Sequence, residues 1–238
     1  MALQDPPPRN RLLAALPPAD LAAFRAQLEP VELAFDTTLL QAHSAWRSVI
    51  FVESGMVSLI ATLAEGEQVE VGVIGSEGLL GLPVILADGH STVEARVQLE
   101  GRGLRLGAEA TRAAMERSPA FRSLVLRYAQ ARHDQVTQTA ACNTYHSAEE
   151  RLARWLLIAH DRAGADSFAM THEFMAMMLG LRRPAVSLTA AALQRAGLIQ
   201  YRRGQMTVAD RPGLEAAACE CYDTTRNEFR RLLGSAVG

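Results

Sequence analysis

An arginine-rich segment in the C-terminal part of the chain carries the clearest chemical signal in the sequence. Between Phe174 and Ala209 there is no acidic residue, whereas five arginines occur there: Arg182, Arg183, Arg195, Arg202 and Arg203. The formal net charge of the whole chain is only −2, so the positive charge is local. A basic stripe on a near-neutral protein is the pattern expected for binding the phosphates of nucleic acid. The alternative is a solvated face in a chain whose 24 basic residues are all arginine.

Two short helices joined by a glycine turn are predicted to position the first of these arginines. Thr171 is a suitable N-cap for a first helix that ends at Gly180. The second helix begins near Arg182 or Arg183 and tolerates Pro184 in its first turn. Its apolar residues recur at spacings of three and four, so they can pack on the first helix. This arrangement is typical of a helix-turn-helix, whose second helix enters the major groove of DNA.

A two-stranded hairpin is predicted directly after the second helix. Arg202, Arg203 and Gly204 form its tight turn, and residues 206–208 return as the second strand. Arginines at such a tip suit phosphate contact, and a guanidinium can also bond a guanine edge. The residues expected to bind DNA are Thr171, Arg182, Arg183, Ala185, Ser187, Thr189, Arg202 and Arg203.

A long helix is predicted to precede this domain, because no glycine or proline interrupts the chain between Pro119 and Tyr145. A 3.5-residue register, the repeat of coiled coils, passes through Phe121, Leu124, Tyr128, Ala131, Gln135, Gln138, Cys142 and Tyr145. This seam is apolar at its ends and polar in its middle, which favours a two-stranded dimer interface. Packing of the helix on its own chain is the alternative. Ser147 and Glu150 form a capping box that starts the next helix.

The residues before the long helix follow the period of β-strands. From residue 31 to residue 106, short runs of alternating apolar residues are separated by turns such as Glu65-Gly66-Glu67. Several short strands at close spacing indicate a compact all-β unit. The predicted class is therefore α+β. A β domain with N-terminal helices covers residues 1–117, the long helix covers 118–146, and a winged helix-turn-helix domain with a C-terminal helix covers 147–238.

Three cysteines occur, at positions 142, 219 and 221. Their odd number argues against a disulfide framework. A zinc site needs about four Cys or His ligands at recognisable spacing, and Cys219-x-Cys221 has no second pair near it in the sequence. We therefore expect buried thiols, no metal ligands and no cofactor.

The sequence also disfavours several classes of protein. Gly-x-Ser-x-Gly, a Walker loop and His-Glu-x-x-His are all absent, so no enzyme is indicated. There is no apolar run long enough to span a membrane and no N-terminal pattern of a secretory signal. A cytoplasmic protein without a membrane partner is expected.

The order of these parts resembles the Crp/Fnr family of transcription regulators. The resemblance rests on residues 51–57 (Phe-Val-Glu-Ser-Gly-Met-Val), residues 75–81 (Gly-Ser-Glu-Gly-Leu-Leu-Gly), Arg151-Leu152-Ala153 and the stretch from Thr171 to Ile199. It implies a β domain that is a double-stranded β-helix, or jelly roll, like the cyclic-nucleotide-binding domains. It also implies a homodimer that binds a roughly two-fold symmetric site in double-stranded DNA. RNA polymerase is a further candidate partner.

The resemblance matches some residues of the second short helix to known contact positions. Arg183 and Ser187 occupy positions that touch bases or phosphates in the family. Pro184 and Leu188 occupy contact positions that are often polar. The DNA sequence that is bound therefore cannot be carried over from other members.

The resemblance also places an effector pocket in the β domain, with Gly75, Glu77, Gly78, His90, Ser91, Thr92 and Thr137 as the expected residues. Members that bind cyclic AMP have an arginine just beyond the glycine-rich turn, where this chain has Ser91. Burial of a phosphate without a guanidinium is costly, so we expect poor or no binding of cyclic AMP and a small-molecule effector of unknown identity. No cysteine precedes Cys142, so the N-terminal iron–sulfur cluster of some members is not expected.

Two alternatives remain open at this point. A haem- or metal-dependent sensor regulator would need an axial ligand, and His90 lies in the corresponding region. A cyclic-nucleotide-binding interaction module would keep residues 20–145 and have no role on DNA.

Overall fold

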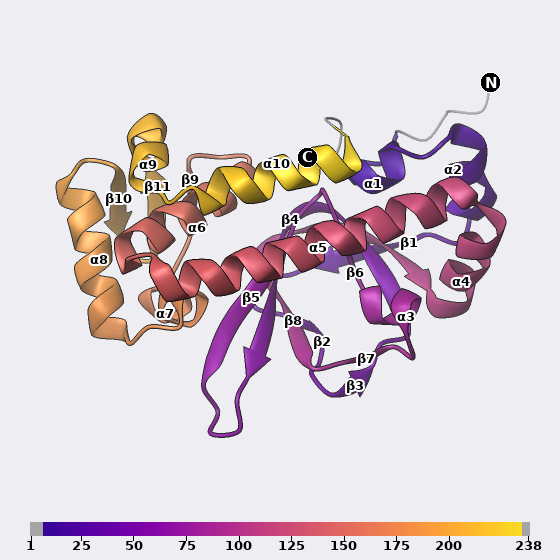
Figure 1. Cartoon of the computed structure of the whole chain (residues 1–238), viewed down its shortest axis with the longest axis horizontal. Coiled ribbons are helices and arrows are strands. Elements are labelled where there is room, and N and C mark those ends of the chain that lie inside the picture. Colours follow the sequence, from indigo (N-terminus) through magenta and orange to yellow (C-terminus); the bar gives the residue numbers. More distant parts are fainter. Residues whose placement is uncertain (1–6, 235–238) are drawn as a thin grey trace.

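The computed structural model describes residues 7–234 of the chain, in which a β domain lies beside a helical domain and long helices run across both (Figure 1). The β domain consists of α1 (Arg11–Ala14), α2 (Pro18–Arg25), β1 (Glu29–Leu33), β2 (Thr38–Leu40), β3 (Ser44–Ala45), β4 (Ser48–Thr62), β5 (Gln68–Ile74), β6 (Leu79–Leu80), α3 (Leu82–Leu86), β7 (His90–Ser91) and β8 (Val93–Gly107). Asn10 caps α1 and fastens it to the sheet, because its side-chain amide donates to Val52 O (2.8 Å) and Gly78 O (2.7 Å).

The two long strands β4 and β8 form the antiparallel centre of the main sheet. β1 and β2 pair with β8, β5 and β6 pair with β4, and β3 pairs with β7 in a separate ribbon. The β4–β8 register shifts between Val52 and Val57. Gly55 lies in this irregularity with a φ of 82°, and a Cβ there would lie 2.5 Å from Leu99 O. Only glycine fits such a close approach of two backbones. The irregularity bends both strands, so that the sheet curls up into the β domain, which is called the roll below.

Two helices follow the roll. After α4 (Ala108–Arg117), α5 (Pro119–Tyr145) runs for 27 residues, as the sequence predicts. Ser118 caps α5 by accepting a hydrogen bond from Phe121 N (2.9 Å). The capping box at the start of α6 (Ala148–Ala163) is also confirmed, with Ser147 and Glu150 bonded to each other's backbone N–H groups.

The helical domain contains β9 (Ser167–Ala169), α7 (His172–Leu179), α8 (Arg183–Arg195), β10 (Ile199–Arg202), β11 (Gln205–Val208), α9 (Arg211–Ala217) and α10 (Cys221–Leu233). The sheet has the order β10–β11–β9. The predicted hairpin is therefore present, and β9 adds a third strand that the sequence did not indicate. The α+β class is confirmed.

The last helix, α10, lies antiparallel along α5 (Figure 1). Phe229 and Leu233 of α10 belong to the same core as Phe121, Leu124 and Tyr128 of α5. The sequence interpretation of the seam through these α5 residues as a dimer interface is therefore wrong. The seam is covered by the chain's own roll and by α10; of its eight residues, only Gln138 and Tyr145 escape full burial.

The two domains share a hydrophobic core. Met56, Val73 and Leu99 of the roll pack in one cluster with residues of α6, α7 and α8, such as Leu156 and Met178. The helical domain consequently rests directly on the sheet. Among residues 7–234, no helix combines the length and apolar character needed to cross a membrane.

Candidate DNA-binding surface and effector region

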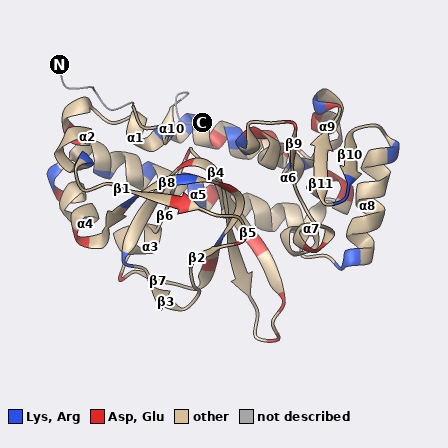
Figure 2. Ribbon diagram, turned by 180° about the vertical axis from the view of Figure 1, so that it is seen from behind, with Lys and Arg blue, Asp and Glu red and all other residues tan. Residues whose placement is uncertain are grey.

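The surface around the start of α8 holds the first group of predicted DNA-binding residues. Gly180 ends α7 in the left-handed conformation (φ 59°), and Arg182 is the N-cap of α8. Val186, Ala190 and Leu193 face the core, as their spacing predicts. Arg182 and Arg183 are exposed, and both ends of α8 are basic (Figure 2). This side of α8 is therefore available to DNA.

Contacts with α7 and the hairpin hold the exposed face of α8. Arg183 forms an ion pair with Glu173, and a hydrogen bond joins Ser187 Oγ to His172 Nδ1 (3.0 Å). The His172 ring stacks on the Tyr201 ring of β10, with centroids 4.6 Å apart. The two helices and the hairpin are thus one connected surface.

The hairpin tip exposes Arg202 and Arg203. Arg203 and Gly204 both have positive φ, 52° and 76°, which is the backbone of the tight turns that suit the twist of a hairpin. Thr171 is exposed at the N-cap of α7, where its hydroxyl accepts from Phe174 N (3.1 Å).

Two predicted positions differ from this pattern. Thr189 is only 6% exposed, and its hydroxyl donates to Ala185 O of its own helix (2.9 Å). It lies three residues after Val186 and four before Leu193, on the buried face, so the prediction that it contacts DNA is wrong. Ala185 is half-buried. Leu188 of the same helix is 72% exposed instead.

The glycine-rich turn of the effector region is occupied by side chains of this chain. Glu77 is buried, accepts a hydrogen bond from Gly75 N (3.0 Å), and pairs with Arg162 of α6 (Nη2–Oε1 2.6 Å). Burial by itself raises the pKa of Glu77, but the Arg162 guanidinium outweighs this effect and holds the pKa below its usual value. A cation from the helical domain therefore already neutralises the carboxylate expected to bind an effector.

Two side chains of α5 fill the space beside this turn. The Tyr128 hydroxyl donates to Leu79 O (3.0 Å), and the ring lies so close to Gly78 that a Cβ there would collide with it. Arg132 donates to Val73 O (2.9 Å), and a Cβ on Gly72 would lie 2.6 Å from its Nη2. Glycine at both positions allows α5 to approach the sheet this closely.

The remaining predicted pocket residues lie elsewhere. Ser91 is buried and its hydroxyl is bonded to Val93 (3.2 Å), while His90 and Thr92 are exposed on and after β7. His90 contacts Asp88 (3.3 Å). Thr137 is exposed on α5, with its hydroxyl bonded to His133 O (3.0 Å). None of residues 90–92 and 137 lines the cavity that lies beside Glu77.

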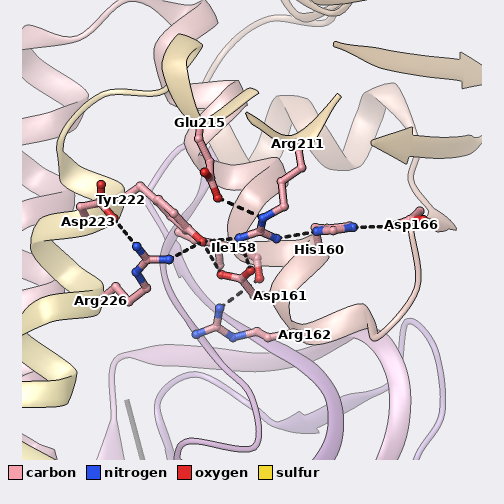
Figure 3. A network of polar contacts seen from close by, with 10 residues as sticks. All are labelled: Ile158, His160, Asp161, Arg162, Asp166, Arg211, Glu215, Tyr222, Asp223 and Arg226. Carbon is pink, nitrogen blue, oxygen red and sulfur yellow. Dashed lines mark hydrogen bonds and ion pairs between the residues drawn. The ribbon is translucent and has the colours of Figure 1, made fainter. Parts of the chain in front are cut away.

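A cavity of about 300 Å³ lies beside Glu77, between the roll, α6 and α10. Arg162, Arg226 and Arg230 contribute cationic groups to its wall. A polar network continues from this wall into the helical domain (Figure 3). In it, the Tyr222 hydroxyl donates to Asp161 (2.7 Å), and Arg211 pairs with Asp161 (2.8 Å). The cavity therefore borders contacts that join α6, α9 and α10.

A buried carboxyl group joins the sheet to α6. Glu70 accepts hydrogen bonds from Ser58 of β4 (2.6 Å) and from Trp155 Nε1 of α6 (2.9 Å). Burial raises the pKa of Glu70 to about 7, although both hydrogen bonds oppose the shift. The sequence alone does not mark Glu70, Tyr128, Arg132 or Arg162 as site residues, because their roles depend on contacts between helices and strands that are distant in the sequence.

Comparison with family models matches both domains. Residues 30–118 match the cyclic nucleotide-binding domain, and residues 150–217 match the Crp-like helix-turn-helix domain. A comparison with curated protein sequences finds no match.

Solved structures share the fold at low sequence identity. A structure described as a transcriptional regulator of the Crp/Fnr family from Eubacterium rectale has a TM-score of 0.70 at 20% identity, over 87% of this chain and 96% of that one. FixK2 from Bradyrhizobium japonicum has a TM-score of 0.70 at 17% identity, over 81% and 98%. The c-di-GMP-responsive regulator CLP from Xanthomonas campestris has a TM-score of 0.64 at 17% identity, over 80% and 98%.

Proposed function

Because the chain belongs to the Crp/Fnr family of DNA-binding transcription regulators, we propose that it acts as a homodimer whose affinity for specific, roughly two-fold symmetric DNA sites is controlled through the β domain. The observation that carries this proposal is the exposed, arginine-rich surface formed by the start of α8 and the hairpin tip. The family consists of regulators and not of enzymes.

DNA recognition is assigned to α8, with phosphate contacts from Arg182, Arg202 and Arg203. Arg183 is the candidate for a contact with a base edge, and such a bidentate contact is worth about 1–3 kcal/mol. We expect Arg183→Ala to lower affinity for a selected binding site about tenfold or more. The measurement is fluorescence anisotropy on a site enriched from random DNA.

Arg117→Ala is the matched control, because Arg117 is exposed on α4, outside the helical domain. Circular dichroism checks that both variants fold. Unchanged affinity of Arg183→Ala would contradict the assignment of α8 as the recognition helix.

The homodimer is assigned to the exposed side of α5. A second 3.5-residue register passes through Leu126, Ala129, His133, Val136, Ala140 and Asn143, all of which are exposed or half-buried. This exposed seam is separate from the seam that the chain's own roll and α10 cover. Its centre contains the polar His133, and a polar residue at such a position fixes the register of two helices.

The signal is proposed not to be cyclic AMP. Ser91 supplies no guanidinium, Glu77 is already neutralised by Arg162, and Tyr128 fills the space over Gly78. The fold does not itself dictate the effector, since one structure of the same fold is that of a c-di-GMP-responsive regulator. RNA polymerase is a further proposed partner of the DNA-bound dimer.

Isothermal titration with cyclic AMP, cyclic GMP and c-di-GMP tests this part of the proposal. For cyclic AMP we expect no heat of binding at micromolar concentrations. Stoichiometric binding of cyclic AMP at such concentrations would contradict the proposal.

A further inference from the structure

Three cysteines and one histidine that are far apart in the sequence meet at the junction of α5 and α10. The ligand atoms of Cys142, His146, Cys219 and Cys221 all lie within 4.8 Å of one another. Cys142 lies in the last turn of α5, and His146 is the C-cap residue directly after that helix. Cys221 is the first residue of α10, and Cys219 lies two residues before it. The fold thus brings Cys142 and His146 to Cys219 and Cys221 as a second pair of ligands, although the two pairs are far apart in the sequence.

Two distances within this cluster match the edges of a tetrahedron around one metal ion. Zinc–sulfur bonds of about 2.3 Å and zinc–nitrogen bonds of about 2.05 Å place two sulfurs roughly 3.8 Å apart and a sulfur and nitrogen roughly 3.6 Å apart. Cys142 Sγ lies 3.6 Å from Cys219 Sγ. Cys221 Sγ lies 3.5 Å from His146 Nδ1. Two opposite edges of the tetrahedron are thus already formed.

The groups around the cluster are those that surround a zinc site. His146 presents Nδ1 to Cys221, and its other ring nitrogen, Nε2, lies 3.2 Å from Glu220 Oε2. A carboxylate on the far nitrogen of a ligating histidine orients the ring and raises its basicity. Gln138 also donates a hydrogen bond to Cys221 Sγ (3.0 Å).

Positive charge lies beside the three thiols. Arg151 and Arg154 interact electrostatically with Cys142. The Nε groups of both arginines are buried without a hydrogen-bond partner among the described residues. Three thiolates and a neutral imidazole leave a zinc site with a net negative charge, which these guanidinium groups would balance.

We propose that Cys142, His146, Cys219 and Cys221 bind one zinc ion. Thiolate and imidazole ligands suit zinc, and a site with four protein ligands is of the closed, structural kind. An iron–sulfur cluster would hold its ligands farther apart, because iron and sulfide atoms lie between them. The ion fastens the end of α5 to the start of α10, and so ties the C-terminal helix to the junction between the long helix and the DNA-binding domain.

Metal analysis of reduced protein, purified without a tag or chelator, provides the first test. We expect about one zinc ion per chain in the wild-type protein. Cys142→Ser, Cys219→Ser, Cys221→Ser and His146→Ala should each lose most of the zinc. The control is His43→Asn, a change at an exposed histidine of the β domain, which should keep it. Circular dichroism reports whether each variant folds.

Cobalt binding to the wild-type protein tests the proposed metal site without any variant, so the result does not depend on whether the variants fold. After the metal is removed, titration with Co²⁺ should produce a thiolate-to-cobalt charge-transfer band and the intense visible bands of tetrahedral cobalt. Excess Zn²⁺ should abolish both. Reduced protein without zinc and without this cobalt spectrum would overturn the proposal. Isolation of a metal-free Cys142–Cys219 disulfide under reducing conditions, or of bound iron at the cluster, would also overturn it. DNA binding plays no part in these readouts, so failure of the proposed function leaves them unaffected.

Discussion

Glu70 and Glu77 are both buried carboxyl groups of the roll, yet their surroundings shift their pKa values in opposite directions. Glu77 faces the Arg162 guanidinium and is held in the charged form. Glu70 has only neutral hydrogen-bond partners, Ser58 and Trp155, so burial dominates and raises its pKa to about 7. The nearest charge therefore decides whether a buried carboxyl group is ionised at neutral pH.

Glu70 makes the stability of the protein depend on pH. Its pKa is about 7 in the folded chain and has the ordinary value of 4.5 when unfolded, so the folded state binds the proton more tightly. The free energy of unfolding should consequently fall as pH rises from about 4.5 to 7, by about 3 kcal/mol. Glu70→Gln should remove this fall and raise Tm at pH 8.

Thermal unfolding from pH 4.5 to pH 8 measures the effect. Glu67→Gln, an exposed carboxyl group in the turn before β5, is the control and should follow the wild type. If Tm of the wild type and Tm of Glu70→Gln change in parallel with pH over this range, Glu70 does not titrate there.

At the scale of elements, α5 has two faces with different roles. Its buried face packs on the roll and α10, and its exposed seam runs from Leu126 to Asn143. We expect Val136→Glu to weaken the dimer roughly a hundredfold, because like charges brought together at a two-fold interface cost several kcal/mol. Light scattering coupled to size-exclusion chromatography measures the mass of the particle.

Ala141→Glu is the matched control for this change. Ala141 is also exposed on α5 but lies outside the two core positions of the repeat, so the variant should remain a dimer. The assignment of the exposed seam fails if Val136→Glu stays dimeric, or if Ala141→Glu dissociates equally.

The sequence predicted those elements whose signals are local. The caps Ser147 and Thr171 and the turn at Gly180 mark helix ends by contacts within four residues, and all three were predicted from sequence alone. The α+β class and the family resemblance followed from the order of the predicted strands and helices along the chain. The three-residue strand β9 has no such signal, because it forms only where β11 offers it an edge.

Errors arose wherever a distant segment decides which face is covered. The buried face of α5 was taken for a dimer seam, because nothing in residues 119–145 reveals that α10 returns to cover it. Thr189 was placed on a face of the helix away from Val186, Ala190 and Leu193, although it is buried beside them. The cysteine and histidine cluster could not be predicted either, since Cys142 and Cys219 are 77 residues apart.

At the scale of the whole molecule, the two domains are packed on one another and share a core. Met56, Val73 and Leu99 of the sheet lie in the same cluster as Leu156 and other residues of the helical domain. Separation of the domains would expose this apolar surface to water, at a cost that grows with its area. We therefore expect a single cooperative transition in differential scanning calorimetry of the full chain. Two resolved transitions, one per domain, would contradict this expectation.

If α8 is the recognition helix, as proposed above, the exposed Leu188 gives it an apolar side chain that can contact a base. Its 72% exposure leaves a branched hydrocarbon on the surface that we propose binds DNA. In the major groove, the apolar group that a base pair presents is the 5-methyl group of thymine. The preferred binding site should therefore contain a thymine under Leu188, recognised by the burial of two methyl-bearing groups. Such a contact involves no charge, so this part of the specificity should persist at salt concentrations that weaken the arginine–phosphate contacts.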